Sequence, residues 1–207
     1  MATADPTTAG PAGASTTEPS AHGTPVAPPT GVGRLGVMLY LSSDVMLFAA
    51  FFAAWYLLRS VNSPWPPDGV HLDTTRALVA PVVLVSSSAT MVLAERALKQ
   101  QALRNYRIWT LATFALGLAF LLNQLDEYRT LPFQVDSHVY GSTYWGLTGL
   151  HTLHVAAGLC ALLVLFFRAT RVAAADALDD WTWGISAYWH LVDVIWVAVF
   201  VTIWVIG

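Results

Sequence analysis

Five long apolar stretches, separated by short polar segments, make up most of the chain after residue 34. They cover approximately residues 35–58, 77–97, 108–126, 141–167 and 184–206. A helix needs roughly 20 apolar residues to cross a hydrocarbon layer of about 30 Å, and these stretches reach or approach that length. Lipid offers the backbone no hydrogen-bond partner, and unbroken runs of this length do not suit the strands of a barrel. The sequence therefore predicts an all-α integral membrane bundle of five transmembrane helices.

The composition excludes several other classes of protein. Charged residues make up 11% of the chain, whereas soluble domains carry roughly 25%. The formal net charge of −3 gives no electrostatic basis for binding nucleic acid. Cys160 is the only cysteine in the sequence, which rules out an internal disulfide and a CxxC redox or zinc motif.

The first 33 residues differ from the rest of the chain. They are rich in Ala, Thr, Pro, Gly and Ser, and they contain no Lys, no Arg and no aromatic residue. Such a segment cannot bury enough apolar surface to offset the entropy lost on ordering. The sequence therefore predicts a disordered tail over residues 1–33 and a membrane domain over residues 34–207.

Basic residues are distributed unequally between the two sides of the predicted bundle. One side carries seven of them and the other side carries three. The seven are Arg34, Arg96, Lys99, Arg104, Arg107, Arg168 and Arg171, and the three are Arg59, Arg76 and Arg129. The positive-inside rule then predicts that the N-terminus is cytoplasmic and the C-terminus is outside.

Asp44 is the one charged residue of the first apolar stretch. It lies about 15 Å along a helix from Arg34, near the expected midplane of the membrane. An ionisable group at this depth costs several kcal/mol unless it is paired, protonated or hydrated. Two interpretations stay open for Asp44: a residue of a proton pathway or lipid cleft, and a buried structural hydrogen bond.

Histidines occur in the last two stretches at helical spacing. His151 and His154 are three residues apart and project from one face of one helix, so together they cannot bind both sides of one haem. His190 and Asp193 repeat this spacing and can pair with each other. The favoured interpretation is that all four are structural polar groups. The alternative is a bis-histidine haem b site that includes His190, in a stand-alone membrane electron carrier.

Two further polar features have structural interpretations. Glu127 follows the third stretch on its predicted outer side, where a charge is ordinary. Residues 86–90 (SSSAT) form a small, polar face in the second stretch, and such faces favour close packing between membrane helices.

Several functional motifs are missing from the sequence. It contains no CxxxC copper motif, no Gly-rich phosphate loop and no histidine set around an open metal position. It also lacks the internal repeats and matched helix breaks that are typical of secondary transporters. A partner subunit of a larger complex is therefore better supported than a self-sufficient enzyme.

The motifs also occur in an order that is typical of a known family. They are SSDVMLF at 42–48, WPP at 65–67, SSSAT at 86–90, GLAFLLNQLDEY at 117–128, YGST at 140–143, TGLHTLHV at 148–155 and YWHLVDVIW at 188–196. In these motifs the chain resembles subunit III of the haem–copper oxidases, the cytochrome c oxidase family. The resemblance extends over residues 34–207.

The chain departs from the usual pattern of that family in three respects. Many members have seven helices, whereas this chain resembles the short five-helix bacterial form. Asp44 stands where many members carry Glu, and Thr152 stands where Gly is usual between the two histidines.

The resemblance implies an accessory subunit that binds no metal itself. In that family, oxygen is reduced at a haem–copper site in subunit I, and electrons arrive through copper in subunit II. Haem a and copper are therefore expected in partner subunits of a proton-pumping, aa3-type cytochrome c oxidase in a bacterial plasma membrane. A quinol oxidase contains an equivalent subunit, so the electron donor stays open.

The resemblance also implies a phospholipid in a V-shaped cleft and support for sustained proton uptake. Asp44 would face this cleft, and Arg168 at an inner helix end would hold a lipid phosphate. The expected partners are subunits I and II, small accessory subunits and, where the oxidase joins a respiratory supercomplex, a cytochrome bc complex.

Overall fold

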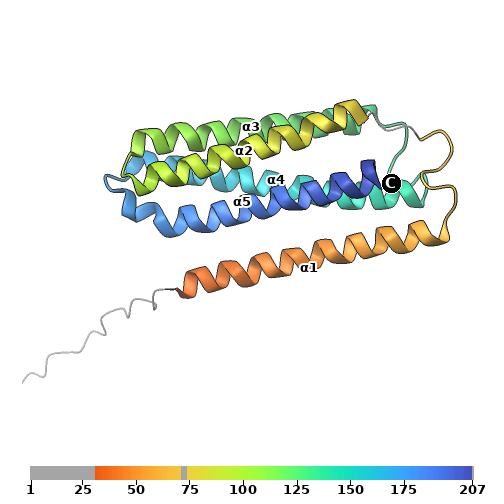
Figure 1. Ribbon diagram of the computed structural model, residues 1–207, viewed down its shortest axis with the longest axis horizontal. Coiled ribbons are helices and arrows are strands. Elements are labelled where there is room, and N and C mark those ends of the chain that lie inside the picture. The colour runs from red at the N-terminus through yellow and green to blue at the C-terminus, as the bar shows by residue number, and fades with distance from the viewer. Residues whose placement is uncertain (1–30, 71–73, 207) are drawn as a thin grey trace, which may run out of the picture. The chain divides into compact units, whose positions relative to one another are not determined.

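The computed structural model describes residues 31–70 and 74–206, and each regular element in these ranges is a helix. The elements are α1 (Val32–Val61), α2 (Thr74–Lys99), α3 (Leu103–Thr130), α4 (Val139–Arg171), η1 (Ala175–Leu178), α5 (Asp179–Phe200) and η2 (Val201–Val205) (Figure 1). Within these ranges, five helices are long and apolar enough to cross a membrane, which agrees with the predicted all-helical class and the five predicted spans. The predicted disordered tail lies outside the described residues, apart from residues 31–33.

The helices extend beyond the apolar stretches from which they were predicted. The fourth stretch, 141–167, lies within a helix of 33 residues, Val139–Arg171. Polar residues lie at both of its ends: His138 precedes the helix, and Arg168 and Arg171 lie in its last turn. The Nδ1 atom of His138 accepts a hydrogen bond from the N–H of Gly141 at 2.7 Å and caps the start of α4. Hydropathy marks the part of a helix that suits lipid, and these added turns lie outside it.

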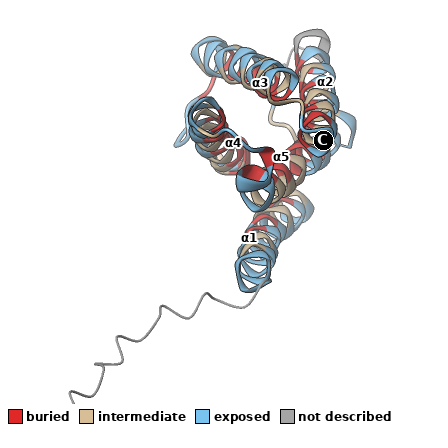
Figure 2. Cartoon of the chain, turned by 90° about the vertical axis from the view of Figure 1, so that its left-hand side faces the viewer, coloured by how far each residue is buried: buried red, intermediate tan, exposed pale blue. Residues whose placement is uncertain are grey.

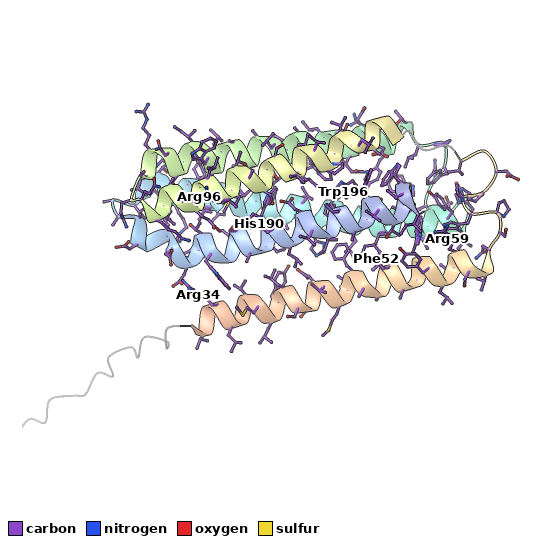
Figure 3. All side chains as sticks on the ribbon, in the orientation of Figure 1. Arg34, Phe52, Arg59, Arg96, His190 and Trp196 are labelled. Carbon is purple, nitrogen blue, oxygen red and sulfur yellow. The ribbon has the colours of Figure 1, made fainter. Side chains whose placement is uncertain are left out.

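Four of the helices pack around a common core, and α1 lies outside them. The view along the bundle shows α2, α3, α4 and α5 as a ring, with α1 against the outside of α5 (Figure 2). Contacts join α2 to α3, α3 to α4, α4 to α5 and α5 to α2, while α1 contacts α4 and α5. Arg34 and Arg59 mark the two ends of α1 (Figure 3), and the two ends of the bundle are named after them below.

Trp189 on α5 is the centre of the four-helix core. Its side chain is fully buried, and its Nε1–H donates a hydrogen bond to the Oγ of Ser87 on α2 at 3.1 Å. A Cβ atom added to Gly117 on α3 would lie 2.5 Å from the ring, and one added to Gly158 on α4 would lie 2.9 Å from it. The two glycines therefore leave the space that the indole fills.

An aromatic cluster holds the first loop to the Arg59 end of the bundle. The rings of Trp55 and Trp65 lie 5.2 Å apart, and Trp65 lies 5.1 Å from Tyr140. Ring pairs in this range add about 0.5–1.5 kcal/mol beyond the area they bury. The loop motif WPP thus packs its tryptophan against α1 and α4.

The contact between Gly117 and Trp189 yields a stability prediction. The Gly117→Ala substitution places a methyl group within the indole, so we expect the free energy of unfolding to fall by about 1–3 kcal/mol. Gly149→Ala is the matched control, because a Cβ atom at Gly149 meets nothing within 4 Å. Denaturation of the full chain in mixed detergent, followed by circular dichroism, measures both. Equal stability of the two variants would contradict the packing described above.

Candidate functional site

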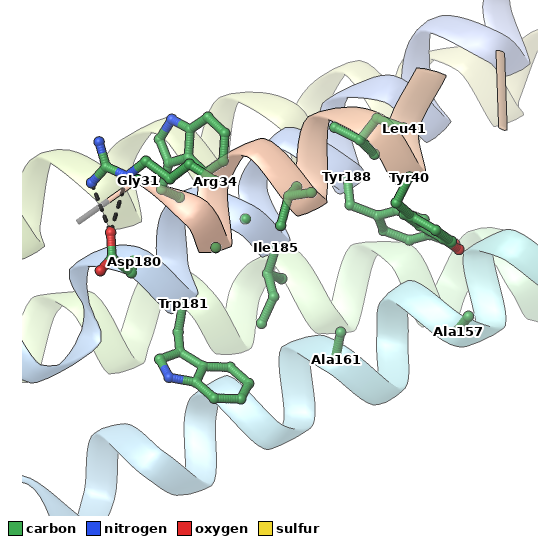
Figure 4. Close-up of a pocket in the computed structure, with 14 residues that line it drawn as sticks. Gly31, Arg34, Tyr40, Leu41, Ala157, Ala161, Asp180, Trp181, Ile185 and Tyr188 are labelled. Carbon is green, nitrogen blue, oxygen red and sulfur yellow. Dashed lines mark hydrogen bonds and ion pairs between the residues drawn. The ribbon is translucent and has the colours of Figure 1, made fainter. Parts of the chain in front are cut away.

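A pocket of about 600 Å³ lies between α1, α4 and α5 near the Arg34 end (Figure 4). Small residues leave space for it, namely Gly33 on α1, Ala157 and Ala161 on α4, and Gly184 on α5. Most of the remaining lining is apolar or aromatic. Its volume falls within the roughly 300–1,000 Å³ range of small-molecule sites, and its composition suits an apolar ligand.

Charged and aromatic side chains surround the mouth of the pocket. The guanidinium of Arg34 on α1 donates to Asp179 and Asp180 at the start of α5, each at 3.0 Å. The same group lies 5.3 Å from the ring centre of Trp183. Exposed ion pairs therefore join the start of α1 to the start of α5.

Arg168 lies close to this mouth but does not line the pocket. Its guanidinium carbon stands 4.3 Å over the ring centre of Trp181, which is a lining residue. A cation over an aromatic face gains about 0.5–1 kcal/mol at exposed sites, and this contact does not require the N–H donors of the guanidinium to bond to a protein acceptor. Arg168 can therefore offer donors to an anionic group beside Trp181.

Two stacked tyrosines form the wall of the pocket that lies deepest in the bundle. Tyr40 on α1 and Tyr188 on α5 have ring centres 6.2 Å apart, and both line the pocket. The hydroxyl of Tyr188 donates a hydrogen bond to the backbone carbonyl of His154 at 2.9 Å. This wall separates the pocket from the polar pair described next.

Asp44 and His154 form a buried polar pair between α1 and α4. The Oδ1 atom of Asp44 lies 3.7 Å from the Nε2 atom of His154, and Asp44 is 7% exposed. The Nδ1–H of His154 donates to the carbonyl of Leu150 at 2.8 Å, so a neutral ring would face Asp44 with a lone pair on Nε2. An attractive contact therefore requires one proton between Nε2 and Oδ1. Asp44 lies one turn from Tyr40, behind the wall of the pocket.

The structure links His190 to Asp193 through a third residue, Ser88 of α2. The Oγ atom of Ser88 lies 2.8 Å from Nδ1 of His190 and donates to Oδ2 of Asp193 at 2.6 Å. The i, i+3 spacing suggested a direct pair within α5. Ser88 belongs to the motif that was interpreted as a packing face, and three consecutive serines in a membrane helix are the sequence signal that would have identified it.

The remaining predicted polar residues lie in separate environments. His151 is fully buried between Phe120 and Trp196, at ring-centre distances of 5.9 and 4.8 Å, and neither ring nitrogen bonds to another described residue. Glu127 accepts a hydrogen bond from the hydroxyl of Tyr144 at 3.1 Å. The rings of His151 and His154 both lie near Phe48 of α1, but only His154 contacts Asp44.

The fold and these sites define a membrane-spanning helical bundle with polar pairs in its interior and an apolar pocket at one end. Among residues 31–70 and 74–206, no group of three or more His, Cys, Asp or Glu side chains is arranged to hold a metal ion. The family model for cytochrome c oxidase subunit III matches residues 15–207. The chain belongs to this family.

Individual relatives agree with the family match. The cytochrome c oxidase subunit 3 of Thermostichus vulcanus is 32% identical over 83% of this chain and 86% of its own length. The protein of the same name from Corynebacterium diphtheriae is 34% identical over 83% and 87% of the two chains. That of Tragelaphus imberbis is 35% identical over 83% of this chain but 68% of its own length. These matches confirm the resemblance in the sequence motifs.

The pair of Asp44 and His154 yields a prediction about coupling between α1 and α4. Asp44→Asn and His154→Leu each remove one partner of a buried contact, so we expect their effects on the free energy of unfolding to be non-additive by about 1–3 kcal/mol. Detergent denaturation of the two single variants and the double variant measures this coupling.

Asp44→Asn combined with Thr170→Val is the control cycle, because the hydroxyl of Thr170 bonds within α4 at the far end of the helix. This control should be additive within about 0.5 kcal/mol. Additivity in the cycle of Asp44 and His154 would show that the two side chains do not interact.

Proposed function

We propose that the chain is the accessory, metal-free subunit III of a proton-pumping, aa3-type cytochrome c oxidase. In this role it packs on subunit I, holds a phospholipid and supports sustained proton uptake. The observation that carries the proposal is the family match over residues 15–207. Haem a and copper then belong to subunits I and II, where oxygen reduction takes place.

The pocket between α1, α4 and α5 supports the lipid part of the proposal. An acyl chain suits its apolar lining, and a phosphate at its mouth would lie near Arg168 and Arg34. Asp179 and Asp180 already balance the charge of Arg34, so Arg168 is the stronger candidate for the phosphate. Asp44 acts from behind the tyrosine wall, by fixing α1 against α4 through His154.

Seven basic residues at the Arg34 end support a cytoplasmic position for that end in a bacterial plasma membrane. The pocket then opens toward the inner leaflet, where anionic lipids and Arg168 would meet. The C-terminus lies outside in this orientation. Subunits I and II, small accessory subunits and a cytochrome bc complex in a supercomplex are the partners of this proposal.

The equivalent subunit of a quinol oxidase is the second candidate function, since electron-donor choice resides in other subunits. A stand-alone haem b carrier is less well supported. His154 would have to leave Asp44 before its Nε2 atom could bind haem iron, and His151 is fully buried between Phe120 and Trp196.

Affinity purification from the native membrane, through a tag on the N-terminus of the full chain, tests the accessory role. Haem a in the eluate with larger co-purifying subunits, and a colourless chain after this subunit is stripped off, are the expected results. Copper-ligand cysteines in a co-purifying subunit would identify cytochrome c as the donor, and their absence would indicate quinol. A lone chain that retains haem b would contradict the proposal.

Filling the pocket tests the lipid site independently of assembly. The Ala161→Phe substitution places a phenyl ring where an acyl chain would lie, so we expect the purified chain to lose most of the phospholipid that the unmodified chain retains. Val164→Phe on the same helix is the control, because Val164 is 49% exposed and lies outside the pocket. Native mass spectrometry counts the retained lipids. Equal retention in both variants would show that the pocket is not the site.

A further inference from the structure

A polar trio made of Ser88, His190 and Asp193 lies between α2 and α5, far from the ends of both helices. At 1.5 Å per residue, Ser88 is roughly 16 Å along α2 from Lys99, and His190 is roughly 16 Å along α5 from Asp179. Figure 3 shows His190 well inside the length of α5. Asp193 is 6% exposed, and its Oδ1 atom has no hydrogen-bond partner among the described residues. An ionisable trio at this depth needs an explanation beyond helix packing.

The hydrogen bonds of the trio determine where its protons lie. A serine hydroxyl has a single proton, and Ser88 donates it to Oδ2 of Asp193 at 2.6 Å. Ser88 must then accept from His190, so the proton of the neutral imidazole is on Nδ1, 2.8 Å away. The Nε2 atom of His190 carries a lone pair in this state, and Asp193 carries the negative charge.

The same heavy-atom positions accommodate one additional proton. A proton that binds Nε2 allows the Nδ1 proton to move to Ser88 and the Ser88 proton to move to Oδ2 of Asp193. Both hydrogen bonds are kept with their directions reversed: Asp193 donates to Ser88, and Ser88 donates to Nδ1. The ring changes from one neutral tautomer to the other, and the charge of the trio changes from −1 to zero.

We propose that Ser88, His190 and Asp193 form a binding site for a single proton, which enters at Nε2 of His190 and is stored on Asp193. Neither state contains an imidazolium ion, which would be costly at membrane depth. Proton uptake removes the single buried charge of the site. The serine is therefore a positioning and relay residue between an imidazole and a carboxylate that share one proton. The site goes beyond the proposed accessory role, because it depends on contacts within this chain alone.

Charged groups line the α2–α5 side of the bundle between the trio and the Arg34 end. Glu95, two turns further along α2, lies within electrostatic reach of His190. It also lines a groove of about 60 Å³ between α2 and α5, together with Lys99 and Asp179. That volume has room for about two water molecules. Water in this groove would contact Glu95, the nearest charged residue of α2 on the Arg34 side of the trio.

Other helices contribute groups that do not join the trio. On α4, His151 packs on Trp196 of α5, and His154 pairs with Asp44 of α1. On α3, the hydroxyl of Thr113 lies 2.9 Å from that of Thr90. The trio can therefore be titrated as one unit, with Glu95 as its nearest charged neighbour on α2.

Nitrogen NMR of the full chain in lipid bilayers, labelled with ¹⁵N-histidine, tests this inference. The chain contains six histidines, and the His190 signals are those lost in His190→Gln. As the pH falls, we expect His190 to change from the Nδ1–H tautomer to the Nε2–H tautomer without passing through imidazolium. An isolated histidine would instead become protonated on both nitrogens.

Three variants separate the relay from a purely structural hydrogen bond. Ser88→Ala and Asp193→Asn should each abolish the tautomer change, whereas Ser88→Thr retains the hydroxyl and should preserve it. Ser86→Ala is the matched control, because its hydroxyl bonds to the carbonyl of Val82 within α2. Imidazolium formation in the unmodified chain, an unchanged tautomer at all pH values, or a tautomer change that persists in Ser88→Ala would each overturn the proposal. The first two of these outcomes are measured on the unmodified chain, so the proposal can be overturned even if a variant fails to fold.

Discussion

The packing of Trp189 determines the arrangement of the other functional side chains. Its ring lies against Gly117 of α3 and Gly158 of α4, and its N–H bonds to Ser87 of α2. One residue of α5 therefore contacts three other helices. In lipid, helices associate through close van der Waals packing and hydrogen bonds, because the hydrophobic effect does not favour protein over lipid. The indole of Trp189 provides both: it packs closely against two glycines, and its single N–H donor is hydrogen-bonded.

This packing fixes the rotation of α5 about its axis. Consecutive residues of a helix point about 100° apart, so a Trp189 that points into the core directs its two neighbours to opposite sides. Tyr188 then faces α1 and α4, where it forms one wall of the pocket, and His190 faces α2, where it contacts Ser88. The packing of Trp189 therefore orients residues of both the pocket and the proposed proton site. Exposed ion pairs such as that of Arg34 contribute only about 0–1 kcal/mol each. They are therefore too weak to determine the rotation of α5.

The sequence predicts the five helices because their lengths and apolar character are direct consequences of crossing a membrane. It also identifies Asp44, His154, His190 and Asp193, since ionisable groups are rare at such depth. Their partners could not be predicted from spacing alone. Residues three apart share a face of one helix, but their contacts depend on the rotation of the neighbouring helices. For that reason His154 contacts Asp44 and His151 does not, and Ser88 stands between His190 and Asp193. The pocket was unpredictable for a related reason, because it depends on where α1 lies.

The bundle accommodates ionisable groups at membrane depth in two different ways, in the pair of Asp44 and His154 and in the pair of Asp193 and His190. Each combines a carboxyl group with an imidazole at membrane depth, and each arrangement is attractive when the pair holds one shared proton. A permanent charge would be costly there, and a purely apolar pair would bind no proton. Asp44 and His154 face each other across 3.7 Å, whereas Ser88 separates His190 from Asp193 with two short hydrogen bonds. The first geometry joins two helices, and the second provides a path along which a proton can move. That difference explains how two pairs of the same residue types can serve different purposes in one bundle.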